Sequence, residues 1–263
     1  MTKLIHPELS YKIHGVFLDI HRQLGPMLPE EFYQKAGLIG LKRIGIECER
    51  EKAFLVSYKG KRVGLYFVDF WIEGGKILLE LKSVQTIMHL HKAQAISYLK
   101  VTNADLAIVV NFGETDLTTE RLPNFVRNRK PALTWNEQQP SETWLYGDLA
   151  RHLVKILHEV HHELGPGFLH QVYRRATIFE LRTAKCLFRY LKELPITYQG
   201  HTIGTHETRL LLIENKILLA TIAVTAIDEA MKRRMKAFMQ MLEVELGLIA
   251  NFYQTELEIS FIR

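Results

Sequence analysis

The sequence repeats itself at a constant distance of 140 residues, and this repeat constrains the fold more than any other feature. Three blocks recur at that offset: LGP at 24–26 and 164–166, KILL at 76–79 and 216–219, and Asn111-Phe112 as Asn251-Phe252. Single residues between the blocks follow the same spacing, for example Tyr33 and Tyr173. A constant offset without insertions or deletions is what a duplication leaves. We therefore expect two copies of one domain.

A chain of 263 residues is long enough for two domains of ordinary size. The segment between the two copies, from residue 113 to 144, is polar, contains three prolines and shows no sustained hydrophobic periodicity. We therefore predict a first domain at residues 1–126, a linker at residues 127–147 and a second domain at residues 148–263.

Composition excludes some classes of protein and permits others. The net charge of +5 permits a polyanionic partner, but the basic surplus is spread thinly over both copies and is weak evidence. Cys48 and Cys186 lie in unrelated contexts, which argues against a zinc site, an iron–sulfur cluster or a disulfide framework. The start of the chain lacks an apolar signal-peptide core, and the longest apolar run, residues 217–227, is too short to span a bilayer. These features predict a cytoplasmic protein without a membrane partner.

Hydrophobic periodicity in the first copy predicts an α/β domain. The predicted elements are a helix at 9–24, a helix that starts at Pro29, strands near 52–58, 63–73 and 76–82, a helix at about 88–101 and a strand at 106–112. The core order αβββαβ implies an antiparallel opening hairpin, a last strand reached by a crossover, and thus a mixed sheet flanked by helices.

Three charges stand inside two otherwise apolar strands, in the stretch VDFWIEGGKILLELKS at 68–83. A two-residue turn at Gly74-Gly75 would place Asp69 directly opposite Glu80, and Lys82 would project from the same face as Glu80. Facing carboxylates repel unless a cation lies between them, and hard oxygen ligands with open positions suit Mg²⁺ or Mn²⁺. The alternative from these residues alone is a surface ion triad on a half-exposed hairpin.

The same residues resemble a known family. An acidic residue followed by Glu-x-Lys on the neighbouring strand, in this order of elements, resembles the core of the PD-(D/E)XK nuclease superfamily. The stretch MLPEEFY at 27–33 is similar to the helix motif of the bacterial GxxExxY proteins in that superfamily: Glu30 and Tyr33 match, and Met27 stands where the family has glycine. Gln94 and Tyr98 in QAISY match the Q-x-x-x-Y motif of RecB-like nucleases. The resemblance implies two tandem restriction-endonuclease-like domains.

The resemblance also implies phosphodiester hydrolysis with Mg²⁺ or Mn²⁺ and a role for each residue. Asp69 and Glu80 would ligate the metal, with Glu30 joining directly or through water. Lys82 would orient or deprotonate the attacking water, or stabilise the transition state by its charge. Gln94 and Tyr98 would position the water or the nucleic-acid strand.

Each of these roles has a plainer alternative. Glu30 could simply complement its helix dipole. Gln94 and Tyr98 could be ordinary polar groups at the edge of the core. His89 and His91 could touch metal or phosphate, but could equally be solvated or cap the helix.

The second copy has lost every candidate site residue. Glu30, Asp69, Glu80, Lys82, Gln94 and Tyr98 correspond at the 140-residue offset to His170, Arg209, Ala220, Ile222, Arg234 and Phe238. We therefore expect an inactive pseudo-nuclease domain that forms an internal pseudodimer with the active copy. Its basic cluster could bind substrate phosphates or could be a solvated helix face; it consists of Lys232, Arg233, Arg234 and Lys236.

These observations predict a metal-dependent nuclease that cuts nucleic acid, with DNA as the expected substrate and one strand broken per encounter. No base-reading element is recognisable. The main alternative is a non-catalytic module that uses two nuclease-like domains to bind nucleic acid or protein. A hydrolase acting on a small acidic substrate is a third possibility.

Overall fold

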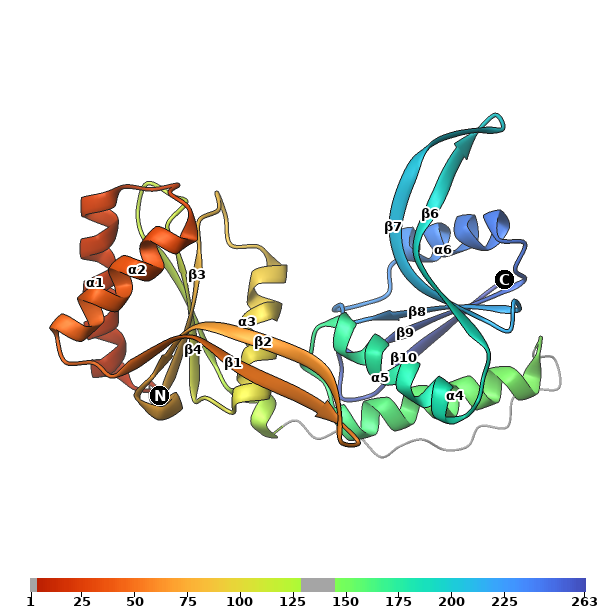
Figure 1. Cartoon of the computed structure of the whole chain (residues 1–263), viewed down its shortest axis with the longest axis horizontal. Coiled ribbons are helices and arrows are strands. Elements are labelled where there is room, and N and C mark those ends of the chain that lie inside the picture. Colours follow the sequence, from red (N-terminus) through yellow and green to blue (C-terminus); the bar gives the residue numbers. More distant parts are fainter. Residues whose placement is uncertain (1–3, 129–144) are drawn as a thin grey trace. The chain divides into compact units, whose positions relative to one another are not determined.

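The structure is a computed structural model that describes residues 4–128 and 145–263. The chain divides into two compact units, Met1–Arg129 and Lys130–Arg263 (Figure 1). Each unit holds its own five-stranded mixed sheet flanked by helices, so the predicted fold class is confirmed at the level of two tandem α/β domains. Most of the predicted linker, residues 127–147, lies outside the described residues, and the boundaries at 126 and 148 remain predictions.

The elements of the first unit follow the predicted order, with a 3₁₀ turn added in the second hairpin and a strand and a 3₁₀ turn added after the last predicted strand. They are α1 (Pro7–Leu24), α2 (Glu30–Arg43), β1 (Cys48–Tyr58), β2 (Lys61–Ile72), the 3₁₀ turn η1 (Glu73–Gly75), β3 (Ile77–Lys82), α3 (His89–Thr102), β4 (Leu106–Asn111), β5 (Thr118–Pro123) and the 3₁₀ turn η2 (Phe125–Asn128). The strand β5 was not predicted, because its residues are polar and half-buried without alternation.

The second unit repeats the first element by element. Its elements are α4 (Gly147–Leu164), α5 (His170–Thr183), β6 (Phe188–Tyr198), β7 (His201–Ile213), β8 (Ile217–Ile222), α6 (Glu229–Met241), β9 (Leu246–Asn251) and β10 (Glu258–Ile262). Every one of these elements starts 140 residues after its counterpart. The repeat read from the sequence is therefore a repeat of the whole fold, including the unpredicted last strand.

Within the first sheet the strands lie in the order β1-β2-β3-β4-β5. The pair β3 and β4 is parallel, with α3 as the crossover, and the other neighbours are antiparallel. Helices α1 and α2 cover one face of the sheet and α3 covers the other (Figure 1). The second sheet has the same arrangement, in the order β10-β9-β8-β7-β6.

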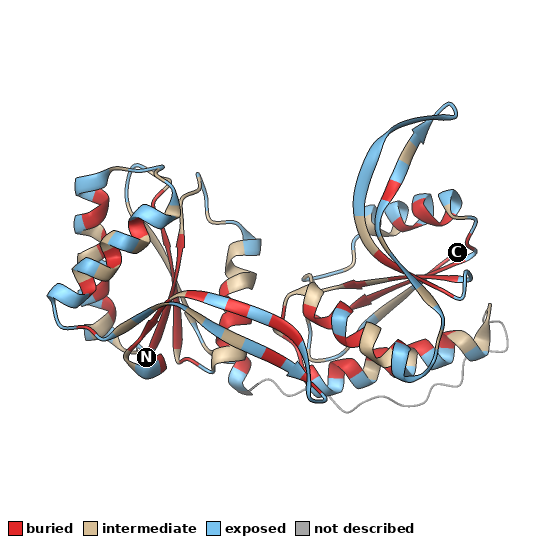
Figure 2. Ribbon diagram, in the orientation of Figure 1, coloured by how far each residue is buried: buried red, intermediate tan, exposed pale blue. Residues whose placement is uncertain are grey.

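The two parallel strands of the first unit form the centre of the core. All of β4 is buried, and so is all of β3 except the half-buried Lys82 (Figure 2). On one face, apolar residues at helical spacing along α1, such as Ile13 and Phe17, pack against Phe70 and Leu79 of the sheet. Because the other face of β3 is covered as well, the hairpin is not half-exposed as the surface-triad alternative requires.

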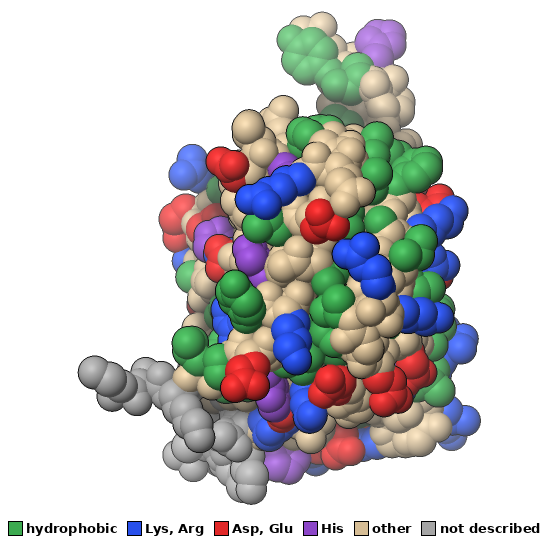
Figure 3. Space-filling model, turned by 90° about the vertical axis from the view of Figure 1, so that its left-hand side faces the viewer, with side chains coloured by type: hydrophobic (Ala, Val, Ile, Leu, Met, Phe, Trp, Pro, Cys, Tyr) green, Lys and Arg blue, Asp and Glu red, His purple; other side chains and the backbone are tan. Residues whose placement is uncertain are grey.

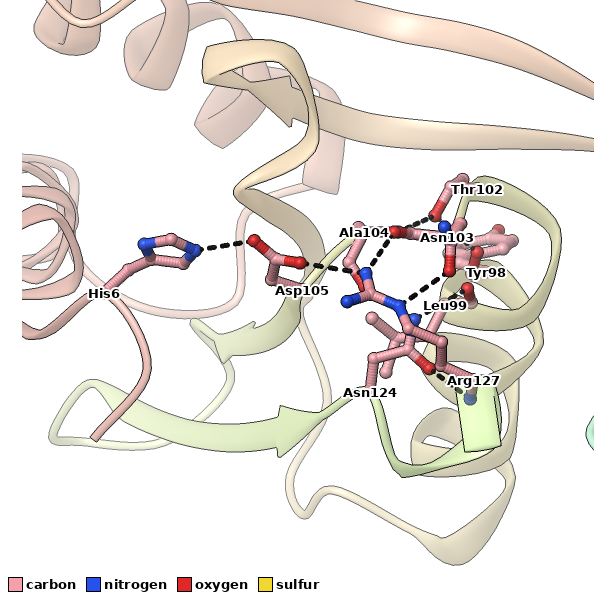
Figure 4. A network of polar contacts seen from close by, with 9 residues as sticks. All are labelled: His6, Tyr98, Leu99, Thr102, Asn103, Ala104, Asp105, Asn124 and Arg127. Atoms are coloured by element: carbon pink, nitrogen blue, oxygen red, sulfur yellow. Dashed lines mark hydrogen bonds and ion pairs between the residues drawn. The ribbon is translucent and has the colours of Figure 1, made fainter. Parts of the chain in front are cut away.

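A polar network at the amino end of β4 ties the segment before α1 to the rest of the first unit (Figure 4). The His6 ring nitrogen Nε2 lies 2.9 Å from Asp105 Oδ2, and Arg127 donates to Asp105 Oδ1 at 2.8 Å. In the second unit Tyr146 donates to Glu245 at 2.8 Å, at the same two positions of the repeat. The two units thus have a side-chain contact at the same pair of positions, but the residues that form it differ.

The hairpin between β2 and β3 has the predicted register but a different turn. Phe70 pairs with Leu79 and Ile72 with Ile77, which is the register in which Asp69 was predicted to lie opposite Glu80. The ladder ends there, so Glu73 and Lys76 are not a strand pair; residues 73–75 form a 3₁₀ turn in which Glu73 itself has a positive φ of 43°.

No described helix is long and apolar enough to cross a membrane.

Candidate active site

Glu80 and Lys82 lie on the carboxyl half of β3, on the face opposite the core formed with α1 and α2. Lys82 Nζ donates to Glu80 Oε1 at 2.5 Å, so the two side chains share one patch as predicted. The Glu80 side chain is only 3% exposed and that of Lys82 is 11% exposed. The second oxygen of Glu80, Oε2, is fully enclosed and has no hydrogen-bond partner among the described residues.

Asp69 does not face Glu80 as a cross-strand pair. The β2–β3 ladder stops one pair earlier, at Phe70 and Leu79, because β2 leaves β3 at this point. The carboxylate of Asp69 takes over the role of the missing strand: its Oδ2 accepts the backbone N–H of Leu81 at 2.6 Å. The carboxylate that the sequence predicted as a metal ligand is therefore also a structural acceptor for the sheet.

The start of α2 supplies two more side chains to this patch. Glu30 Oε2 lies 3.9 Å from Lys82 Nζ, with 38% of its side chain exposed. One helical turn later, Gln34 donates to Asp69 Oδ1 at 2.8 Å. The sequence reasoning missed Gln34, although its position four residues after Glu30 puts it on the same helix face. Its replacement by Arg174 in the second copy was the available signal.

The electrostatics of the patch follow from its burial. Burial raises the pKa of Asp69 to about 6, against the hydrogen bond from Leu81 and the charge of Lys82, which lower it. Burial and then the charge of Asp69 raise the pKa of Glu80 to about 8, although Lys82 lowers it. Both carboxyl groups therefore resist ionisation in the metal-free protein.

Lys82 is held as an ammonium ion. Burial alone lowers the pKa of Lys82, but the charge of Glu80 and the hydrogen bond to it outweigh burial, and the net shift is upward. Glu30 and Asp69 act in the same direction. Before a metal binds, Lys82 is thus suited to stabilise negative charge rather than to accept a proton.

Helix α3 places Gln94 and Tyr98 on the side of β3 that is opposite α1 and α2, where the two side chains contact each other. Gln94 donates to the Tyr98 hydroxyl at 2.7 Å, and the Tyr98 ring packs edge-on against Tyr66 of β2. Burial, followed by the charge of Glu80, raises the pKa of Tyr98. Neither side chain bonds directly to Asp69, Glu80 or Lys82 within the described residues, so they border the patch rather than complete it.

The two histidines before α3 separate into different roles. His91 Nδ1 accepts the backbone N–H of Met88 at 3.1 Å, which caps the start of α3. Of the alternatives for these histidines, helix capping is therefore the one that the structure shows for His91. His89 is exposed.

The donor set fits a hard divalent cation such as Mg²⁺ or Mn²⁺. An enclosed carboxylate oxygen without a partner is costly unless something binds it, and Glu80 Oε2 is such an atom. Among residues 4–128 and 145–263 no three His, Cys, Asp or Glu side chains already form a metal cluster. In the metal-free arrangement the ammonium of Lys82 supplies the positive charge beside Glu80.

Polar residues that both units share are structural. Tyr33 donates to the carbonyl of Gly25 and accepts from Leu28, and Tyr173 makes the same two bonds to Gly165 and Phe168. Contacts are also kept at the repeat offset by His21 with His161 and by Asn111 with Asn251. The candidate site residues and Gln34, in contrast, are all replaced in the second unit, while these scaffold contacts persist.

The basic cluster predicted on α6 lies at a hollow of the second unit. A pocket of about 620 Å³ between α6 and the last strands is lined by Lys232, Arg233 and Lys236, and Arg263 adds a fourth cation. Lys232 is paired with Glu229 at 2.8 Å. Arg234, although predicted with the others, does not line this pocket.

Comparison with known proteins agrees with the fold and the repeat. A family model described as PD-(D/E)XK nuclease superfamily matches residues 7–122 and again residues 147–263. No curated protein matches the chain. Among solved structures, the chain is similar to one titled "Crystal structure of SSO0001", with 20% sequence identity and a TM-score of 0.27. The match covers 45% of this chain and 63% of that chain, so it spans less than two thirds of the solved structure. Because the family match covers most of both units, the chain belongs to the PD-(D/E)XK nuclease superfamily, as two tandem domains of that fold.

Proposed function

We propose that the first unit is a metal-dependent nuclease that hydrolyses phosphodiester bonds of nucleic acid, with DNA as the first candidate substrate. The observation that carries the proposal is Glu80: its side chain is 3% exposed, and one of its oxygens has no hydrogen-bond partner in the part of the chain that the structure describes. Retaining a carboxylate in that environment costs stability, as the pKa raised to about 8 expresses. Such a cost is typical of residues kept for chemistry rather than for folding.

The residues of the patch divide the work in this proposal. Asp69, Glu80 and, from the start of α2, Glu30 offer the carboxylate oxygens that hold Mg²⁺ or Mn²⁺. The bound ion would neutralise charge on the scissile phosphate and lower the pKa of a coordinated water. Gln34 fixes the orientation of Asp69 through its 2.8 Å bond to Oδ1.

The other groups act on the substrate and the water. Lys82 keeps its proton on Nζ and stabilises the negative charge that develops on the phosphate. Gln94 and Tyr98 position the attacking water or the nucleic-acid strand from the covered side of β3. In this proposal the motifs at 27–33 and 94–98 assign the first unit to the GxxExxY proteins and to the RecB-like nucleases.

We further propose that the second unit is catalytically inactive, as one half of an internal pseudodimer, with domain boundaries at residues 126 and 148. Ala220 and Ile222 replace the carboxylate and the ammonium of Glu80 and Lys82, so this unit lacks the chemistry described above. The pocket beside α6 would instead bind substrate phosphates through Lys232, Arg233 and Lys236. Figure 3, which looks onto the side of the molecule where α1 and α2 lie in Figure 1, shows acidic and basic side chains interspersed there.

Cleavage of supercoiled plasmid in Mg²⁺ or Mn²⁺ tests the proposal. We expect the wild type to accumulate nicked circles, and the Glu80→Gln and Lys82→Met variants to lose cleavage by at least about 100-fold. Lys76→Met is the matched control, because it removes a lysine whose ion pair with Glu73, at 2.8 Å, lies in the turn of the same hairpin. A single-stranded oligonucleotide assayed in parallel distinguishes strand preferences.

Two outcomes would reject parts of the proposal. Equal cleavage by the wild type and Glu80→Gln would mean that this patch is not the source of activity, and a metal-dependent binding protein without catalysis would then be the better description. Linear plasmid formed without a nicked intermediate would contradict a single active unit.

A further inference from the structure

The patch of the first unit has a counterpart of opposite charge in the second unit. At the positions of Glu30, Gln34 and Asp69 the second unit has His170, Arg174 and Arg209. His170 and Arg174 lie one turn apart on α5, as Glu30 and Gln34 do on α2. Two acids and an amide have thus been replaced by a histidine and two arginines on the same elements of the same fold.

Arg174 is the unusual member of this set. It is 7% exposed, and its guanidinium lies over the Tyr190 ring, 5.6 Å from the centroid. In the described part of the chain it makes no ion pair and no hydrogen bond, although a guanidinium carries five N–H donors. Buried charges in proteins are normally paired, so this side chain lacks the anion that its environment calls for.

The guanidinium can still be reached by a ligand. The unpartnered side-chain atoms that are fully enclosed belong, among the described residues, to Ser10, Glu80 and Thr221. The nitrogens of Arg174 are not among these atoms, so each retains some access to solvent. Stacking on Tyr190 uses the face of the guanidinium and leaves its N–H edge for an acceptor.

The groups around Arg174 favour an anion. The first turn of α5, with His170 at its start, presents backbone N–H groups and the positive end of the helix dipole. Arg209 is close enough to lower the pKa of both His170 and Arg174, after burial as the main cause. One carboxylate is nearby: Glu207 bonds Arg209 at 2.7 Å and so offsets part of its charge.

We propose that the second unit binds a phosphate group at Arg174 and Arg209, beside the start of α5. The planar fork of Arg174 suits two oxygens of one phosphate, and a phosphate can also accept from backbone N–H groups at a helix N-terminus. The phosphate can belong to a nucleic-acid backbone or to a free phosphate. The inference needs no catalysis by the first unit; it rests on the proposed function only in naming nucleic acid as one source. The first unit would hold phosphate through a metal, and the second through its own cations.

A binding assay with the full chain tests this site. Glu80→Gln serves as the background so that substrate is not cleaved, and binding of a fluorescent oligonucleotide is followed by anisotropy over a range of salt concentrations. We expect Arg174→Gln to weaken binding about 10-fold and to reduce the salt slope by about 1. Arg151→Gln is the matched control, because Arg151 lies on α4 of the same unit with 55% of its side chain exposed. This substitution should leave the affinity and the salt slope unchanged.

Thermal unfolding with inorganic phosphate provides the second readout and separates the sources. One outcome is that phosphate raises the Tm of the Arg151→Gln variant but not that of the Arg174→Gln variant, while both variants bind the oligonucleotide equally. This outcome would support the site and would identify free phosphate as its ligand. Arg174→Lys should bind with intermediate affinity, because it keeps the charge without the fork. Equal affinity and equal phosphate stabilisation in Arg174→Gln and the control would overturn the inference. Failure of cleavage by the first unit would not affect either readout.

Discussion

The carboxylate of Asp69 accepts the backbone N–H of Leu81 at 2.6 Å, at the point where β2 leaves β3. One side chain therefore serves the sheet and the proposed metal site together. This double use predicts that two substitutions of Asp69 will separate stability from activity.

Asp69→Asn should abolish cleavage while keeping most of the stability, because an amide oxygen can still accept from Leu81. Asp69→Ala should abolish cleavage and also destabilise the protein by about 1–3 kcal/mol, since it leaves a buried N–H without an acceptor. Urea unfolding of both variants measures the difference. Equal stability of the two variants would show that the bond to Leu81 contributes nothing.

Gln34 should act as a positioning residue, through its 2.8 Å bond to Asp69. Gln34→Ala should raise the Mg²⁺ concentration needed for half-maximal cleavage by about 10- to 100-fold, with recovery of activity at high metal. Gln23→Ala is the control, because Gln23 makes a similar 2.9 Å bond to Asp19 on an exposed helix face. An unchanged metal requirement accompanied by lower Tm would instead indicate a purely structural role.

Stability of the metal-free protein should fall as pH rises. The pKa of Glu80 is raised from 4.5 to about 8 and that of Asp69 from 3.8 to about 6, so the folded state binds more protons than the unfolded state between these values. The penalty is absent below the unfolded values and complete above about pH 8. Lys82 titrates above this window, because the net shift of its pKa is upward from 10.5.

Replacing Glu80 with glutamine isolates its share of this effect. In the presence of EDTA, Glu80→Gln should have a higher Tm than the wild type at about pH 8.5, and the difference should shrink toward about pH 4.5. Thermal unfolding across this range measures it. A wild-type Tm that rises with pH more steeply than that of the variant has the opposite sign and would contradict the raised pKa.

Replacing Met27 with glycine should stabilise the first unit. It has a φ of 66°, in the left-handed region that favours glycine, and the second unit has Gly167 with positive φ at the same position. Met27→Gly should stabilise the first unit by about 1 kcal/mol, since the Met27 side chain is 56% exposed and loses little packing. Met27→Ala controls for the lost side chain, and glycine should exceed alanine in Tm.

The fold was predictable from the sequence wherever periodicity carried the information. The start of α2 after Pro29, the register of Phe70 with Leu79 and the repeat offset all followed from local pattern. Strand β5 did not, because it is a half-buried edge strand whose polar residues run without alternation up to Pro123. It recurs in the second unit as β10, so it is a regular part of the repeated fold.

The candidate site was predictable in its residue types but not in its bonding. The paired differences between copies marked Glu80 and Lys82, and the structure brings these two together. The bond from Leu81 to Asp69 could not be foreseen, because it depends on where β2 separates from β3 in three dimensions. Gln34 was missed because no local pattern links α2 to β2, although its replacement by Arg174 in the second copy marked the position.

The ion pair of Lys82 with Glu80 has one further consequence for how the protein meets a metal. The ammonium is tethered to the chain and bonds only one carboxylate oxygen, Oε1, at 2.5 Å. A dication at the proposed site would bind Glu80 through Oε2 beside this fixed positive charge, and repulsion between the two cations would raise the concentration of free metal at which the site fills.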